Sequence, residues 1–142
     1  MPEPSIWANA TVSAIVGGAS GGIISLIGLY LMDGRNRYAL ASGSFSARLE
    51  DLVVDGAEYW LKAGQDGALE KRIKEHLERV DLRMQSLKKF SKGKKAMPLL
   101  EQNLDRLSDS LTGGEFEGRD RPIQRVRVSR IRTAVKEMQD LL

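Results

Sequence analysis

The sequence predicts an all-α protein: one N-terminal transmembrane helix followed by a small antiparallel four-helix cytoplasmic bundle. The 29 residues of segment 4–32 contain no Asp, Glu, Lys, Arg or His, and all 22 Lys and Arg lie beyond them. After this segment, apolar residues recur at the three- and four-residue spacing of amphipathic helices. Short connections separate these stretches, as expected for an antiparallel bundle.

The predicted membrane-spanning helix is Ala10–Met32. Its 23 residues would extend about 35 Å at about 1.5 Å per residue, enough to cross a bilayer core of about 30 Å. Trp7 and Tyr30 lie near its two ends, where amphipathic rings prefer the membrane interface. We therefore expect a single-pass protein of the inner (plasma) membrane.

The basic residues near this helix predict its orientation. Arg35, Arg37 and Arg48 follow the span, and no Lys or Arg precedes it. The positive-inside rule then places the N-terminus outside and the C-terminal domain in the cytoplasm. The absence of cysteine fits a reducing compartment for that domain.

Two other interpretations of the first segment rank below the membrane helix. A cleaved signal peptide needs a basic start, whereas residues 1–5 offer only the acid Glu3. Val16–Ile23 resembles the glycine loop of short-chain dehydrogenases, in which bare backbone approaches a pyrophosphate. The rest of the chain lacks the alternating strands and helices that such a fold requires.

Small residues form two adjacent rows on the predicted span. Each row repeats every four residues and contains a Gly-x-x-x-Gly step, which lets helix backbones approach closely in lipid. This broad face predicts self-association into a homo-oligomer, with a partner membrane protein as the alternative. The predicted oligomerisation residues are Ala10, Ser13, Ala14, Gly17, Gly18, Gly21, Gly22 and Ser25.

The predicted organisation has four parts. Residues 1–9 form a short translocated N-terminus, 10–32 the transmembrane helix, 33–45 a juxtamembrane hinge and 46–142 the cytoplasmic bundle. Gly34 and Gly43 would allow bends in the hinge, although the span could instead continue through it as one helix.

The first two bundle helices are predicted from their caps and apolar spacing. The first starts at a cap on Ser44 or Ser46 and ends near Ala63. Its apolar face comprises Phe45, Leu49, Leu52, Val53, Tyr59 and Trp60. The second is the most periodic segment of the chain. Its apolar face comprises Leu69, Ile73, Leu77, Val80, Met84 and Leu87.

The last two bundle helices follow the same logic. The third is predicted from Pro98, in its first turn, to Leu111, with Gly113 as C-cap. The fourth is predicted from residues 120–122 to the C-terminus. The inward residues are Leu100, Leu104, Leu107 and Leu111 in the third helix, and Ile123, Val126, Ile131, Val135, Met138 and Leu142 in the fourth. A coiled coil between subunits would leave three apolar stripes without partners, so a bundle within one chain is favoured.

Arg72 and His76 are the only candidates for catalysis that the sequence offers. A single histidine in a chain without cysteine makes no zinc site, and a boundary or surface position is the favoured interpretation of His76. The pair resembles the Arg and His of HEPN ribonucleases, helical bundles in which Arg holds a phosphate and His acts on a 2′-hydroxyl. The spacer of three residues here is shorter than theirs.

Two basic clusters predict binding to an anionic partner or to lipid headgroups. A solvated face, paired with acids on neighbouring helices, is the alternative interpretation. Few aromatic residues accompany the arginines, which argues against base stacking. The clusters comprise Lys88, Lys89, Lys92, Lys94 and Lys95, and then Arg119, Arg121, Arg125, Arg127, Arg130 and Arg132.

The sequence thus predicts a non-enzymatic membrane protein that self-associates through its glycine-rich face. Its output would be a pore or another perturbation of the membrane, as in a toxin-like or antiviral effector. The order of a span and a bundle resembles the small membrane-pore accessories of some RNA-guided antiviral systems. The expected partners are the lipid bilayer, further copies of the chain, and a cytosolic protein or RNA. No metal, cofactor or small-molecule substrate is expected. A membrane anchor whose bundle binds a cytosolic partner is the first alternative, and a HEPN-like RNA-binding or RNA-cleaving bundle is the second.

Overall fold

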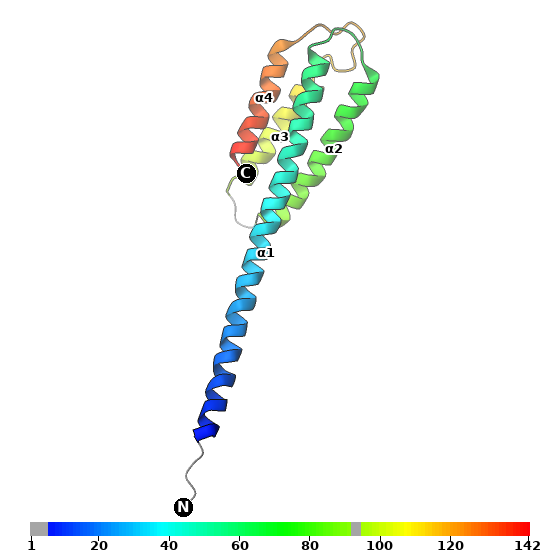
Figure 1. Cartoon of the computed structure of the whole chain (residues 1–142). Helices are drawn as coiled ribbons and strands as arrows, with labels where there is room; N and C mark the ends of the chain where they lie inside the picture. Colours follow the sequence, from blue (N-terminus) through cyan, green and yellow to red (C-terminus); the bar gives the residue numbers. More distant parts are fainter. Residues whose placement is uncertain (1–5, 92–94) are drawn as a thin grey trace, which may run out of the picture. The chain divides into compact units, whose positions relative to one another are not determined.

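The structure is a computed structural model that describes the backbone of residues 6–91 and 95–142, and the side chains of residues 33–91 and 95–142. Its four helices are α1 (Ile6–Trp60), α2 (Gly67–Phe90), α3 (Met97–Thr112) and α4 (Arg125–Asp140) (Figure 1). The residues so described include no strand, which confirms the all-α prediction.

The chain divides into two compact units, Met1–Arg37 and Tyr38–Leu142. In the first unit the backbone is helical from Ile6 onward. The alternative of a dinucleotide-binding loop at Val16–Ile23 is therefore wrong, because such a loop is not helical. The side chains of the predicted span, Ala10–Met32, lie outside the described residues.

A search for membrane-spanning helices covers the described residues only. Within them, none of the helices combines the length and the apolar character that crossing a bilayer demands.

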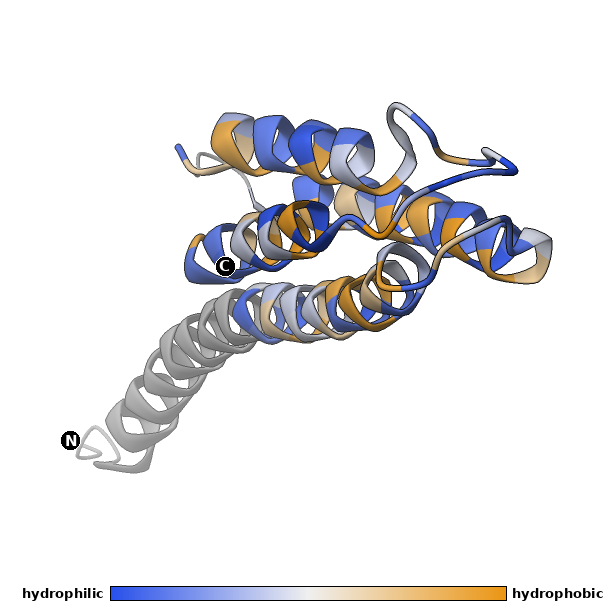
Figure 2. Cartoon of the chain, turned by 90° about the horizontal axis from the view of Figure 1, so that it is seen from above, coloured by the Kyte–Doolittle hydropathy of each residue, from blue (hydrophilic) through white to orange (hydrophobic). Residues whose placement is uncertain are grey.

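Residues 38–142 form a four-helix bundle in which consecutive helices run in opposite directions (Figure 1). Hydrophobic and hydrophilic residues lie on different sides of the same helices (Figure 2). One continuous core results, as expected when amphipathic helices bury their apolar stripes against each other. The predicted core residues that are buried are Phe45, Leu49, Leu52, Tyr59, Trp60, Leu69, Ile73, Val80, Met84, Leu87, Leu100, Leu107, Leu111, Ile131, Val135 and Met138.

Some predicted core positions differ from expectation. Val53, Leu77, Leu104 and Leu142 are only partly buried, at the edge of the core. Two residues of the predicted fourth helix, Ile123 and Val126, were assigned wrongly, because 53% and 66% of their respective surfaces are exposed. Val128 and Ala134 are buried instead.

The start of α4 explains the errors at Ile123 and Val126. The predicted start at residues 120–122 is wrong, because α4 begins at Arg125. The preceding segment pairs with the end of α1: the Gln124 N–H donates to the Trp60 carbonyl (2.9 Å), and the Gly64 N–H donates to the Arg121 carbonyl (2.9 Å). These bonds hold the segment in a non-helical conformation.

Helix α1 has no break at the predicted hinge. Its bounds include Gly34 and Gly43, and neither Ser44 nor Ser46 begins a helix. The other ends agree better with expectation. Pro98 lies in the first turn of α3 and Gly113 is its C-cap. Helix α2 begins after Asp66, whose carboxylate accepts a hydrogen bond from the Leu69 N–H at 3.1 Å.

Glycine at position 56 permits a close approach of α1 to side chains of α3 and α4. A Cβ atom placed there would lie 2.6 Å from Leu111 Cδ2 and 3.0 Å from Ile131 Cδ1, whereas one at Gly43 would meet nothing within 4 Å. The two glycines therefore have opposite roles. Gly56 is a packing requirement, and Gly43 only loosens an exposed helix.

Substitution of these glycines should change stability in opposite directions. We expect Gly56→Val to lower the free energy of unfolding by about 1–3 kcal/mol, because a branched side chain overpacks the core. Gly43→Ala should raise it by about 0.5–1 kcal/mol, because alanine is the better helix former. Urea denaturation followed by circular dichroism measures both. A Gly56→Val variant as stable as Gly43→Ala would contradict this packing.

Candidate functional site

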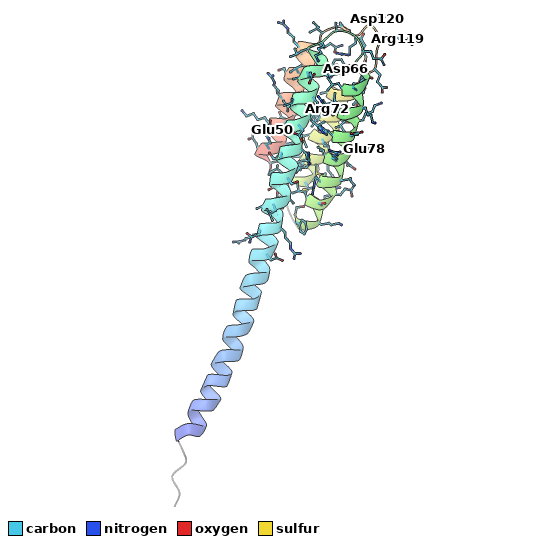
Figure 3. All side chains as sticks on the ribbon, turned by 45° about the vertical axis from the view of Figure 1, so that its right-hand side comes forward. Glu50, Asp66, Arg72, Glu78, Arg119 and Asp120 are labelled. Carbon is cyan, nitrogen blue, oxygen red and sulfur yellow. The ribbon has the colours of Figure 1, made fainter. Side chains whose placement is uncertain are left out.

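The structure brings Arg72 and His76 to a polar cluster between α1 and α2. Arg72 Nη2 lies 2.8 Å from Asp55 Oδ1 and 3.2 Å from Glu58 Oε2. His76 Nδ1 lies 2.9 Å from Asp55 Oδ2. Asp55 is the centre of the cluster, since its side chain is only 7% exposed and contacts both basic residues. Figure 3 labels Arg72 where α1 and α2 run side by side.

The contact between Asp55 and His76 is close without being a hydrogen bond. Asp55 Oδ2 and His76 Nδ1 are both buried, and within the described residues neither has a hydrogen-bond partner. The two atoms are near enough, but the ring is not aligned to direct an N–H at the oxygen. His76 is 16% exposed, which agrees with the boundary position expected from the sequence.

The cluster suits a structural tie better than a phosphate site. The guanidinium of Arg72, which would have to hold a phosphate, already contacts two carboxylates. Its hydrogen bond with Asp55 raises the pKa of Arg72 further. A second phosphate-binding cation is not available from Lys62, which pairs with Glu58 at 2.8 Å and lowers the pKa of that carboxyl. An anionic substrate would have to displace these carboxylates.

The described residues of the first basic cluster, Lys88, Lys89 and Lys95, lie at the end of α2 and just before α3. Lys88 and Lys89 occupy the last turn of α2, where cations favour the helix dipole. Lys88 pairs with Glu101 of α3. Lys95 is exposed, and Lys92 and Lys94 lie outside the described residues.

The second basic cluster separates into exposed and internal members. Arg119, Arg125, Arg130 and Arg132 are exposed. Arg119 and Asp120 lie at the same end of the bundle as Asp66 (Figure 3). Arg121, in contrast, is only 2% exposed. Its guanidinium is thus part of the interior and is no longer available to a ligand on the surface.

Arg121 closes the C-terminal end of α1. Its Nη1 donates to the carbonyls of Tyr59 (2.5 Å) and Lys62 (2.8 Å), and its Nη2 donates to that of Gly64 (2.6 Å). These carbonyls have no partner within a helix, and the guanidinium also complements the negative end of the helix dipole. The group stacks 3.6 Å from the centroid of the Tyr59 ring.

Tyr59 links the same corner to α2 and to the connection before α4. Its hydroxyl donates to Glu70 Oε1 (2.8 Å) and accepts from the Glu117 N–H (3.0 Å). Burial is the main cause that raises the pKa of Tyr59 above its ordinary value. The carboxylate of Glu70, itself buried, thereby gains a partner inside the bundle.

Arg127 performs a similar task at the end of α3. Its Nη1 donates to the carbonyls of Asp109 (3.3 Å) and Ser110 (3.2 Å). Its guanidinium carbon lies 4.3 Å from the Trp60 ring centroid, and Trp60 Nε1 donates to the Leu111 carbonyl at 3.1 Å. Two arginines of the predicted anion-binding cluster therefore bind backbone carbonyls at helix ends.

The sequence offers little that would distinguish Arg121 and Asp55. Arg121 lies among other arginines in a glycine-rich connection, and Asp55 lies among other acids in residues 50–58. Asp55 falls at helical spacing from the predicted inward residues Leu52 and Tyr59, which is the one signal that could have indicated its burial.

Comparison with known proteins identifies no relative. No family model, no curated protein and no solved structure matches this chain.

Replacing Arg121 tests its role at the end of α1. We expect Arg121→Gln to lower the free energy of unfolding by about 2–4 kcal/mol, because buried carbonyls lose charge-assisted donors. Arg119→Gln, the exposed control two residues earlier, should change it by less than about 0.5 kcal/mol. Chemical denaturation compares the two. Equal stability of both variants would show that α1 ends without help from this guanidinium.

A second matched pair tests the tie between α1 and α2. Asp55→Asn should lower the free energy of unfolding by about 1–3 kcal/mol, because the buried carboxylate is the main partner of Arg72. Asp51→Asn removes an exposed carboxylate that pairs with Arg48 at 3.1 Å, and should cost less than about 1 kcal/mol. The same denaturation measurement serves both variants. A larger loss for Asp51→Asn would overturn this ranking.

Proposed function

We propose that the chain is a single-span membrane protein of the inner membrane that self-associates through its glycine-rich helix face. In this proposal Ala10–Met32 spans the bilayer and residues 38–142 form a cytoplasmic domain. The assembly alters membrane permeability, as a toxin-like or antiviral effector would. The bundle sets the number of subunits and receives the signal or partner that controls the assembly.

One observation carries the proposal. A 23-residue uncharged segment presents two complete rows of small residues, each with a Gly-x-x-x-Gly step. In lipid, apolar helices gain nothing from the hydrophobic effect when they associate, so close backbone packing has to drive assembly. Glycine is a poor helix former, and close packing against a neighbouring helix is the compensation that the two rows offer.

The core and the buried charged groups of the bundle also bear on the proposal. Its apolar residues close one core within residues 38–142, and its buried charged groups Asp55, Glu70 and Arg121 contact partners in that same unit. The core and the buried charged groups of residues 38–142 are thus accounted for within that unit. We assign the small face of the first segment to association.

Substitution in the glycine rows tests self-association. With Gly17, Gly18, Gly21 and Gly22 changed to Leu, the complex extracted from membranes should fall to the mass of a monomer, because leucine keeps backbones apart. Val16, Ile23 and Ile27 lie outside these rows, and their change to Leu is the matched control that should leave the mass unchanged. Native mass spectrometry measures both. A wild-type chain that is monomeric at all concentrations would contradict the proposal.

A membrane anchor with a partner-binding bundle is the alternative, and replacing the span distinguishes it. A Leu-rich helix of equal length in place of residues 10–32 should abolish the change in membrane permeability if the small face assembles the protein. Retained activity would favour the anchor.

A further inference from the structure

A groove between α1 and α2 gathers three arginines that the sequence clusters do not include. It has a volume of about 350 Å³ and is lined by Arg48, Arg79, Leu82, Arg83 and Ser86. Arg48 comes from α1 and the other four come from α2. The sequence alone does not indicate that these arginines lie together, because Arg48 is 31 positions from Arg79.

The charges of α2 are sorted between its two flanks. Glu78 and Asp81 line a different groove, on the side of α3, together with Asp105. Arg79 and Arg83 line the groove on the side of α1. Glu78 and Asp81, the acids nearest to these arginines in sequence, therefore form no ion pair with them.

The arginines of the groove are only partly neutralised. Arg48 Nη1 lies 3.1 Å from Asp51 Oδ2. Arg79 and Arg83 form no ion pair with any residue in the described ranges 33–91 and 95–142. They are one helical turn apart, an arrangement of like charges that destabilises a helix unless an anion lies between them.

We propose that this groove binds a phosphate monoester. Guanidinium groups bind phosphate through pairs of parallel hydrogen bonds. Three arginines and the paired Asp51 leave two positive charges, which match the charge of about −2 that a phosphate monoester carries at neutral pH. The volume suits a small ligand. Ser86 supplies a hydroxyl, which in the free protein donates to the Leu82 carbonyl at 3.3 Å.

A phosphorylated soluble molecule and the headgroup of phosphatidic acid share this chemistry. The inference is independent of self-association, because the groove lies within one chain. Loss of assembly in the glycine variants would leave it untouched.

Calorimetric titration of the full chain in detergent micelles tests the proposal. One arm adds glycerol phosphate, and the other adds phosphatidic acid in mixed micelles, with phosphatidylglycerol as a lipid that carries only a phosphodiester. We expect saturable binding of one or both monoesters. Arg79→Gln with Arg83→Gln should weaken it at least tenfold, because both uncompensated charges are removed. Arg125→Gln with Arg132→Gln makes the same change of charge on α4 and should leave it within twofold.

The arms identify the source of the ligand. Binding of glycerol phosphate indicates a soluble ligand, and binding of phosphatidic acid alone indicates a lipid headgroup. The proposal is wrong if neither monoester binds, if phosphatidylglycerol binds equally well, or if both double variants weaken binding equally. It is also wrong if only single-stranded RNA binds through Arg79 and Arg83. Thermal melting of each variant verifies that the bundle remains folded.

Discussion

The bundle depends on how the C-terminal end of α1 is closed. There one buried guanidinium donates hydrogen bonds to carbonyls that have no partner within a helix. Arg121 donates to the carbonyls of Tyr59, Lys62 and Gly64 and stacks on the Tyr59 ring. Gly64 has a φ of +84°, which a glycine adopts without strain. The end of α1, the turn after it and the segment before α4 thereby meet around a single side chain, and the Tyr59 hydroxyl extends the corner to Glu70 of α2.

This arrangement gives the arginines of the last third of the chain two different tasks. Arg121 and Arg127 bind backbone carbonyls at the ends of α1 and α3. Arg119, Arg125, Arg130 and Arg132 are exposed and can meet a partner. Fewer arginines of this cluster are therefore available to a partner than the sequence suggests. The groove between α1 and α2 is a basic surface that composition does not reveal. Arg48 is remote in sequence from the other two arginines, and Arg79 and Arg83 lie among acids in the sequence.

The core of the bundle could be predicted because it depends on local periodicity. The six predicted inward residues of α2, from Leu69 to Leu87, recur at helical spacing, and all six pack in the core or at its edge. The inward face of α1, from Phe45 to Trp60, could be predicted from the same apolar spacing. Amphipathic spacing reports which side of a helix is apolar, and in a small bundle only one core can accept that side.

The errors and omissions arise where long-range polar contacts override the local pattern. Ile123 and Val126 continue an apolar spacing, but the pairing of residues 121–124 with the end of α1 delays the helix and exposes both. Asp55 and Arg121 are buried because residues distant in sequence supply their partners. No pattern of nearby residues encodes such contacts. The sequence therefore names only part of this polar cluster: Arg72 and His76 are its candidates, and Asp55, the carboxylate that contacts both, is missing.

Amide hydrogen exchange at the corner closed by Arg121 tests this account most directly. The N–H groups of Gly64, Glu117 and Gln124 donate to the Arg121 carbonyl, the Tyr59 hydroxyl and the Trp60 carbonyl. All three lie in connections rather than in helices. The account predicts protection close to that of core amides such as Leu107, because the corner opens only when the bundle unfolds. Exchange at the rate of free loop amides would contradict it.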